Sequence, residues 1–155
     1  MFRKLNFPDY PFKIQRVENK FMIFDQLRKK YVRLTEEEWV RQHMVAYVIH
    51  ERKIPQGLIK IESGLKYEKL KKRTDILIYN RTGLPYLMIE CKSPSVKLDQ
   101  KVLFQAGIYG KSLEVPFLGI TNGLAHYFWQ IDYKRGDTKI LSEFPDFNLK
   151  NARKS

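Results

Sequence analysis

Two acidic residues and a lysine lie close to the ends of two neighbouring apolar segments. Glu90 and Lys92 are separated by one residue at the end of one segment, and Asp75 stands near the start of the segment before it. Because strand side chains alternate between faces, Glu90 and Lys92 point the same way and Cys91 points the other way. If the two segments form an antiparallel hairpin across Gly83, Asp75 falls opposite the end that holds Glu90 and Lys92.

Two carboxylates that converge at one end of a sheet form a hard-oxygen site suited to Mg²⁺ or Mn²⁺. The adjacent ammonium of Lys92 can orient or deprotonate water, or stabilise a pentacovalent phosphate. The alternative is a cross-strand salt bridge between Lys92 and Asp75 or Glu90. Both segments are otherwise apolar, which predicts burial, and buried charges cost several kcal/mol unless they are paired or metal-bound. This context favours the metal site.

Length and charge limit the class of protein. The chain has 155 residues, which suits one domain, and 29 Lys plus Arg against 17 Asp plus Glu give a net charge of +12. Such an excess favours a polyanionic partner, with nucleic acid first, although a solvated basic surface is the alternative. The single cysteine excludes an internal disulfide and indicates a cytoplasmic protein. No apolar run approaches the roughly 20 residues that span a bilayer, so no membrane association is expected.

The order of predicted elements indicates an α/β (α+β) fold with a mixed sheet and helices packed on it. Residues 1–34 form an N-terminal β extension with a hairpin, residues 35–147 form the core, and residues 148–155 form a polar tail. A helix begins at Thr35, with Glu38 as its capping-box partner, and runs to about residue 51. The remaining predicted elements are strands at 58–65, 73–79 and 85–92, a helix at 99–112, strands at 115–121 and 124–131 joined by an Asn122-Gly123 turn, and a strand at 138–141.

Several short segments carry a resemblance to a known family. The sequence resembles the PD-(D/E)xK nuclease superfamily, and within it the N-terminal domain of type I restriction enzyme R subunits. The resemblance covers Leu5 to Trp129. The matching segments, in the order of the family, are Ile23-Phe24-Asp25, Arg28-Lys29-Lys30-Tyr31-Val32, Leu34-Thr35, Glu37-Glu38-Trp39-Val40-Arg41-Gln42, Lys72-Arg73-Thr74-Asp75, Ile89-Glu90-Cys91-Lys92-Ser93-Pro94, Gln105 with Tyr109, and Thr121-Asn122-Gly123.

The resemblance implies a restriction-endonuclease-like core and a Mg²⁺- or Mn²⁺-dependent nuclease that acts on nucleic acid, with DNA as the expected substrate. Gln105 and Tyr109 match a Gln-x-x-x-Tyr signature and, being four residues apart, share a helix face. Gln105 would orient Lys92 or a phosphate. The implied catalytic residues are Asp75, Glu90, Lys92, Glu37 and Gln105, and the implied metal ligands are Asp75, Glu90, Glu37 and the backbone carbonyl of Cys91.

The acidic residue from the first helix is chosen by helical phase. At 100° per residue, Glu36 and Glu37 lie within about 60° of the direction of Val40, and Glu38 faces away. Glu37 is therefore the expected ligand, and Glu38 is mainly a cap. The alternative is that all three residues only complement the helix dipole.

Candidate nucleic-acid contacts lie in two loops. Lys71, Lys72 and Arg73 belong to a basic run that enters the Asp75 strand and could contact the phosphate backbone, although an ordinary solvated loop would show the same pattern. The resemblance suggests that Thr121 or Asn122 touches a phosphate, although Asn122 is first a turn residue. Tyr109, on the second predicted helix, is a further candidate contact.

The sequence departs from the family in three respects. Thr74 replaces the proline of the motif, and Glu36 stands where close relatives usually have proline. No helicase or translocase follows, so complete restriction activity is not expected from this chain. A homodimer, or a separate motor or specificity subunit, would then supply targeting. A non-catalytic DNA-binding or assembly module on the same fold is the alternative function.

Overall fold

The computed structural model describes residues 2–62 and 75–147. Within these ranges, the side chains of Glu62, Asp75, Gly107 and residues 109–113 lie outside the described set. The predicted basic loop at 71–73 and the predicted tail at 148–155 also lie outside it. Among the described helices, none is long and apolar enough to cross a membrane.

The N-terminal region forms a sheet of its own. It contains β1 (Ile14–Val17), β2 (Lys20–Asp25) and β3 (Lys30–Arg33), paired antiparallel in the order β1-β2-β3. Glu18 and Asn19 close the first hairpin with positive φ values of 49° and 67°, the conformation that a tight hairpin turn requires. The predicted hairpin is confirmed, and the third strand completes a separate sheet.

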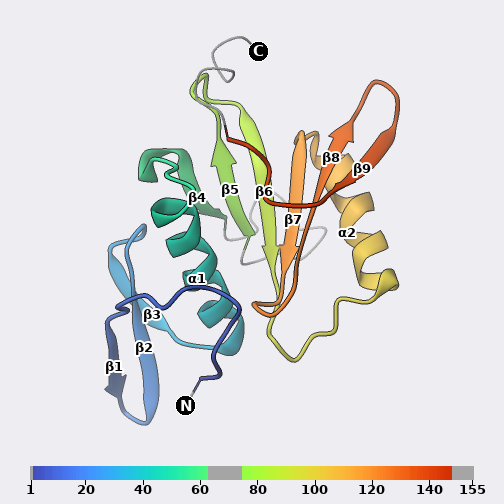
Figure 1. Cartoon of the computed structure of the whole chain (residues 1–155). Helices are drawn as coiled ribbons and strands as arrows, with labels where there is room; N and C mark the ends of the chain where they lie inside the picture. Colours follow the sequence, from blue (N-terminus) through green and yellow to red (C-terminus); the bar gives the residue numbers. More distant parts are fainter. Residues whose placement is uncertain (1, 63–74, 148–155) are drawn as a thin grey trace.

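The first helix begins where its capping signal predicts. Helix α1 spans Glu36–His50, and the Thr35 side chain accepts a hydrogen bond of 3.1 Å from the backbone N–H of Glu38. Three acidic residues occupy its first turn, where they complement the positive end of the helix dipole. The helix lies between the small sheet and the larger one (Figure 1).

Within the described residues, the larger sheet has six strands in sequential order, and it is mixed as predicted. Among these described strands, only β6 (Pro85–Cys91) and β7 (Phe117–Thr121) pair in parallel, because helix α2 (Gln100–Leu113) forms the crossover between them. Asp99 caps α2 by accepting a hydrogen bond of 3.0 Å from the N–H of Val102. A 3₁₀ turn, η1 (Gln56–Leu58), precedes the sheet, whose strands are β4 (Ile59–Glu62), β5 (Asp75–Tyr79), β6 (Pro85–Cys91), β7 (Phe117–Thr121), β8 (His126–Asp132) and β9 (Asp137–Leu141).

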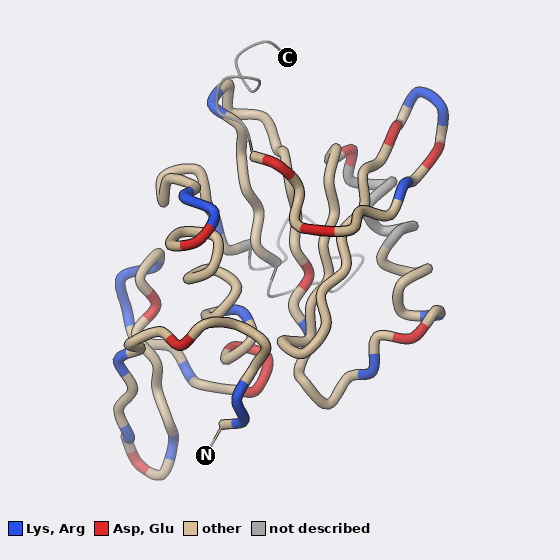
Figure 2. The backbone as a smooth tube through the Cα atoms, viewed as in Figure 1, with Lys and Arg blue, Asp and Glu red and all other residues tan. Residues whose placement is uncertain are grey.

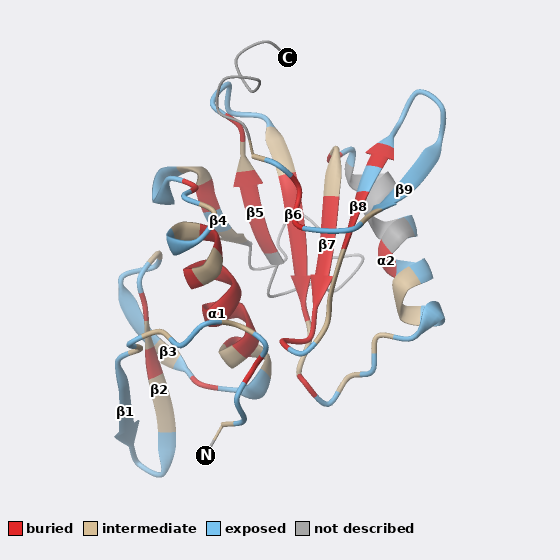
Figure 3. Ribbon diagram, in the orientation of Figure 1, coloured by how far each residue is buried: buried red, intermediate tan, exposed pale blue. Residues whose placement is uncertain are grey.

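The two helices cover opposite faces of the six-stranded sheet. One buried cluster joins Val40 and Met44 of α1 to Ile89 of β6, and another joins Ala106 of α2 to Met88 of the same strand. Because adjacent strand residues face opposite sides, Ile89 lies on the α1 face and Met88 on the α2 face. The central strands are buried, whereas β1 and β9 are exposed (Figure 3).

The turn between β7 and β8 is longer than the predicted Asn122-Gly123 pair. Strand β7 ends at Thr121 and β8 begins at His126, so residues 122–125 form the connection. The Asn122 side-chain oxygen accepts hydrogen bonds from the N–H groups of Leu124 (2.9 Å) and Ala125 (2.8 Å). This side chain competes with the ladder for backbone donors, which is why the strands separate two residues early on the β8 side.

Candidate functional site

The pairing of strands β4, β5 and β6 brings three acidic positions into one row. Ile76 pairs with Ile89 in the antiparallel β5–β6 ladder, so the preceding position, Asp75, lies opposite Glu90. On its other side, Asp75 pairs with Glu62 of β4. Residues that are directly opposite in a sheet share a face. The predicted hairpin is thus confirmed, and it places the Asp75 position opposite Glu90.

Glu90 and Lys92 lie on the same side of the chain, as strand alternation predicts. Lys92 Nζ is 2.8 Å from Glu90 Oε2, and the side chains are 28% and 4% exposed, respectively. Glu90 is two residues after Met88 in β6, so both side chains lie on the α2 face of the sheet. Cys91 lies on the other face, in the buried cluster under α1. The ammonium therefore offsets a buried carboxylate while part of the lysine side chain remains open to solvent.

The first turn of α1 reaches the end of strand β6. The Ser93 hydroxyl donates a hydrogen bond of 3.0 Å to Glu36 Oε2, directly after Lys92 in the chain. Glu36 is exposed and Glu37 is half-buried. The first turn of α1 thus contacts the segment that directly follows the Glu-x-Lys strand, through Glu36. The selection of Glu37 as a metal ligand stays a prediction.

Glu38, which helical phase predicts to face away from Val40 and to act mainly as a cap, is buried. It lies opposite Val40 by helical phase, but the three-stranded sheet covers that side, and Glu38 is only 7% exposed. Its carboxylate accepts hydrogen bonds from Arg41 and, at 2.8 Å, from Gln42. Gln42 also donates to Asp25 Oδ2 of β2 at 3.1 Å. The helix and the small sheet are thus joined by a polar network.

Arg41 is the centre of this network. It is 1% exposed, and its Nη1 atom lies 3.5 Å from Asp25 Oδ2. Burial lowers the pKa of Arg41, and the charge of Arg28 lowers it further, while Cys91 and Asp25 oppose the shift. Burial alone would raise the pKa of Asp25, but hydrogen bonds and charge from Arg28, with a hydrogen bond from Gln42, lower it. Asp25 is therefore held as a carboxylate.

The predicted Gln105 lies on α2, on the side that faces away from the outer strands. Leu103 lines a groove with Trp129 of β8 and Ile140 of β9. Gln105 is about 200° further around the helix at 100° per residue, which turns it toward the β6 side of the sheet. It is exposed. The side chain at position 109 lies outside the described residues.

Thr121 and Asn122 hold two loops together beside Lys92. The Lys92 N–H donates to the Thr121 carbonyl at 2.8 Å, and the Asn122 side-chain amide donates to the Val96 carbonyl at 2.9 Å. Thr121 is fully buried and Asn122 is 7% exposed. These bonds fix the β7–β8 turn against the loop that follows β6. A phosphate contact by either side chain stays a prediction.

Part of the predicted site lies outside the described residues: the side chains of Asp75 and Tyr109, and Lys71, Lys72 and Arg73 entirely. Among the side chains that the structure does describe, no three His, Cys, Asp or Glu residues come together as a metal site. Glu62 was not among the predicted site residues, because strand alternation alone does not reveal which residue of a neighbouring strand lies opposite Asp75.

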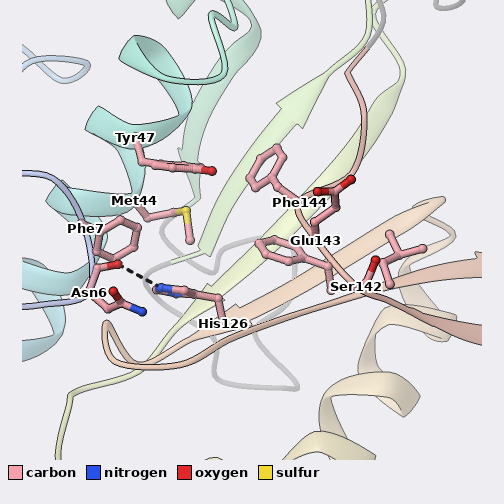
Figure 4. Close-up of a pocket in the computed structure, with 10 residues that line it drawn as sticks. Asn6, Phe7, Met44, Tyr47, His126, Ser142, Glu143 and Phe144 are labelled. Atoms are coloured by element: carbon pink, nitrogen blue, oxygen red, sulfur yellow. Dashed lines mark hydrogen bonds between the residues drawn. The ribbon is translucent and has the colours of Figure 1, made fainter.

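A cavity of about 270 Å³ lies on the α1 face of the sheet, opposite the Glu90 face (Figure 4). His126 lines it at the start of β8. Its Nδ1 atom is 2.7 Å from the Thr121 hydroxyl and its Nε2 atom is 3.3 Å from the Asn6 carbonyl. A neutral imidazole with its proton on Nε2 satisfies both contacts. Burial lowers the pKa of His126, and the Asn6 hydrogen bond only partly opposes this shift.

Protein stability is expected to fall in acid because of this histidine. Its pKa is lowered from the ordinary value of 6.5 in the folded protein, so the unfolded chain binds the proton first. The free energy of unfolding therefore decreases as the pH falls below 6.5, by at most about 1.4 kcal/mol per pH unit for one proton, until the folded pKa is passed. His43, whose pKa burial also lowers, adds to this dependence.

Urea unfolding at several pH values between 5 and 8 measures the effect. In His126→Gln, the free energy of unfolding is expected to decrease less steeply with falling pH, because the contribution of this one titrating group is removed. An identical pH dependence in the wild type and His126→Gln would show that His126 does not take part.

A family model matches most of this chain. The family model described as the type I restriction enzyme R protein N terminus matches residues 36–145. The chain is 28% identical over 100 residues to the endonuclease subunit of the type I restriction enzyme EcoAI from Escherichia coli. This alignment covers 61% of the chain. A solved fragment described as a type I restriction enzyme HsdR subunit from Vibrio vulnificus YJ016 is 33% identical over 48% of this chain, with a TM-score of 0.33. The chain spans only 12% and 14% of these two proteins.

Proposed function

Because this chain belongs to the family of type I restriction enzyme R protein N-terminal domains, we propose that it is a divalent-metal-dependent nuclease domain of the PD-(D/E)xK type that cleaves DNA. The observation that carries the proposal is the β5–β6 register, which sets the Asp75 position opposite Glu90. Lys92 is paired with Glu90 at 2.8 Å on the same side. The core would correspond to a restriction-endonuclease-like sheet.

The donor chemistry fits Mg²⁺ or Mn²⁺. Glu90 is a carboxylate with 3% exposure, and Asp75 adds a second hard oxygen donor in the opposite position of the sheet. The Cys91 carbonyl and an acidic residue of α1, Glu37 or Glu36, complete the proposed set. When bound, the ion would polarise the phosphodiester and lower the pKa of a coordinated water.

Lys92 is the proposed group that acts on the attacking water. Its ammonium donates hydrogen bonds, and its side chain is 28% exposed, so a phosphodiester can approach it. The water oxygen bonds to phosphorus and gives up one proton to the surrounding solvent. The bond from phosphorus to the leaving oxygen breaks, and the leaving oxygen takes up one proton from solvent. Gln105, on the β6 side of α2, would orient Lys92 or a phosphate oxygen.

Other parts of a larger assembly are proposed to direct this domain. The relatives carry names of restriction enzyme subunits, and this chain matches a small part of their length. Targeting would therefore come from motor or specificity subunits, or from a homodimer.

Cleavage of supercoiled plasmid tests the function. With Mg²⁺ or Mn²⁺, the wild type is expected to produce nicked and linear DNA, and an excess of EDTA is expected to stop the reaction. Salt-dependent DNA binding without cleavage in either metal would instead identify a non-catalytic binding module. Cleavage that continues in EDTA would contradict a metal-dependent site.

A further inference from the structure

The three-stranded sheet carries a dense positive charge that the proposed active site does not use. Between residues 13 and 33 the sequence has seven Lys or Arg and two Asp or Glu. All seven basic residues are exposed, and they recur along the small sheet (Figure 2).

Strand pairing divides them between the two faces. Arg16 lies opposite Phe21 and Lys30 opposite the buried Asp25, on the face toward α1. The outer face carries Lys20 opposite Val17, Arg33 opposite Met22, and Lys13 over the Phe24 ring. These three outer-face cations, Lys13, Lys20 and Arg33, define what we call the basic sheet surface.

The two acidic residues of this segment do not balance the charge. Asp25 is buried, with Arg28 Nε at 2.8 Å and Arg41 Nη1 at 3.5 Å from its carboxylate, so its charge is shared by these two arginines. Glu18 sits in the first hairpin turn. Within the described part of the chain, no carboxylate forms an ion pair with the three residues of the basic sheet surface.

The fold holds some of the cations of the small sheet in defined positions. Arg16 lies over the Phe21 ring at 5.7 Å and donates to Asn19 at 3.2 Å. Lys13 lies over the Phe24 ring at 5.6 Å. Cation–π contacts of this kind leave the charge available to a further partner while restricting the side chain, and restricted side chains lose less entropy when they bind.

The Asp25 carboxylate also builds the turn between β2 and β3. It accepts hydrogen bonds from the N–H groups of Leu27 (2.9 Å) and Arg28 (2.8 Å). The turn ends at Lys29, which has a positive φ of 58°, a conformation that costs a non-glycine residue about 1 kcal/mol. Consecutive cations repel one another, so this turn concentrates charge at the expense of local stability.

The basic sheet surface lies at the same end of the molecule as the candidate site. Strand β3 ends at Arg33 and α1 begins at Glu36, whose carboxylate bonds to Ser93 just beyond Lys92. The small sheet flanks α1 near the end where β6 terminates (Figure 1). A long polyanion bound at Lys92 can therefore continue past the start of α1 onto the sheet.

We propose that the basic sheet surface binds the phosphate backbone of duplex DNA beside the cleavage site. The identity of the polyanion rests on the proposed function, whereas the charged surface itself does not. Three strands spaced ~4.8 Å apart span about 10 Å, over which a duplex presents about six phosphates. Exposed cations on a sheet, without base-reading side chains in a groove, predict binding that is salt-dependent and independent of sequence.

Fluorescence anisotropy with a labelled DNA duplex of about 25 base pairs in EDTA tests the surface without cleavage. The variant Lys13→Gln/Lys20→Gln/Arg33→Gln removes the three exposed charges of the basic sheet surface. The matched control, Lys134→Gln/Arg135→Gln/Lys139→Gln, removes three charges from the exposed β8–β9 hairpin. Circular dichroism and urea unfolding verify that both variants fold.

The sheet variant is expected to weaken binding at least tenfold at moderate salt and to reduce the slope of log Kobs against log salt by about one to three. The control is expected to retain most of the affinity and slope. Equal losses in the two variants, or no binding of duplex DNA by the wild type, would overturn the proposal. If the wild type binds through this sheet but never cleaves with metal, the surface stands and the nuclease function fails. If the sheet variant cleaves DNA with an unchanged KM, DNA binding by the basic sheet surface is contradicted, whereas the proposed nuclease function is not.

Discussion

Lys92→Ala is expected to lower the single-turnover rate of metal-dependent DNA cleavage by roughly 10²–10⁴-fold, the usual contribution of a positioned acid–base group. The lysine Nζ lies 2.8 Å from Glu90, at the exposed end of strand β6, and it is the proposed donor to the attacking water. Binding of duplex DNA in EDTA is expected to change little, because this prediction concerns the chemical step. The rate is measured with protein in excess over labelled DNA.

Two further variants separate chemistry from stability. Lys92→Ala leaves Glu90, which is 3% exposed, without this ammonium, so the variant is also expected to be less stable. Lys92→Arg retains a cation for Glu90 but changes the geometry and basicity of the donor, and it is expected to remain folded with strongly reduced cleavage. Lys97→Ala, in the exposed loop after β6, is the matched control. Cleavage at the wild-type rate by a folded Lys92→Arg and by Lys92→Ala would refute the assigned role.

Arg41→Met is expected to reduce the free energy of unfolding by about 3–5 kcal/mol, the usual effect of removing one partner from a buried ion pair. Methionine keeps most of the apolar stem but removes the charge that faces Asp25 and Glu38. Arg41 is 1% exposed, so solvent cannot replace the lost interactions. Urea unfolding monitored by tryptophan fluorescence measures the change, with Arg33→Met on the exposed face of β3 as the control.

A combined variant tests whether the loss arises from uncompensated charge. Asp25→Asn/Glu38→Gln/Arg41→Met removes both carboxylates together with the guanidinium, and it is expected to regain a substantial part of the stability lost by Arg41→Met. Non-additivity of this kind is the signature of a coupled network. If Arg41→Met is as stable as the wild type, the network does not hold the small sheet against α1.

Local rules predicted the part of the site that depends on neighbouring residues. Strand alternation placed Glu90 and Lys92 on one side, and the polar turn around Gly83 predicted the hairpin that sets the Asp75 position opposite Glu90. The Thr35 cap and the start of α1 also followed from short-range signals. In each case the determining interactions lie within a few residues or within one hairpin, where sequence periodicity carries the information.

The features that local rules did not predict depend on contacts between distant segments. The amphipathic phase of α1 placed Glu38 opposite Val40, but it could not reveal that a second sheet covers that side. The Ser93–Glu36 bond joins residues far apart in sequence, and the Glu62–Asp75 pair requires the strand order. The four-residue turn after Thr121 differed from prediction because the Asn122 side chain takes over backbone hydrogen bonds.

The most direct test of the proposed metal site is a crystal of the wild type soaked in Mn²⁺ and measured at an X-ray energy where manganese scatters anomalously. We predict an anomalous peak between the carboxylates of Asp75 and Glu90, and its loss in a crystal of Asp75→Asn treated in the same way. No peak at this position, at a Mn²⁺ concentration that supports cleavage in solution, would contradict the assignment of Asp75 and Glu90 as the metal ligands of a nuclease.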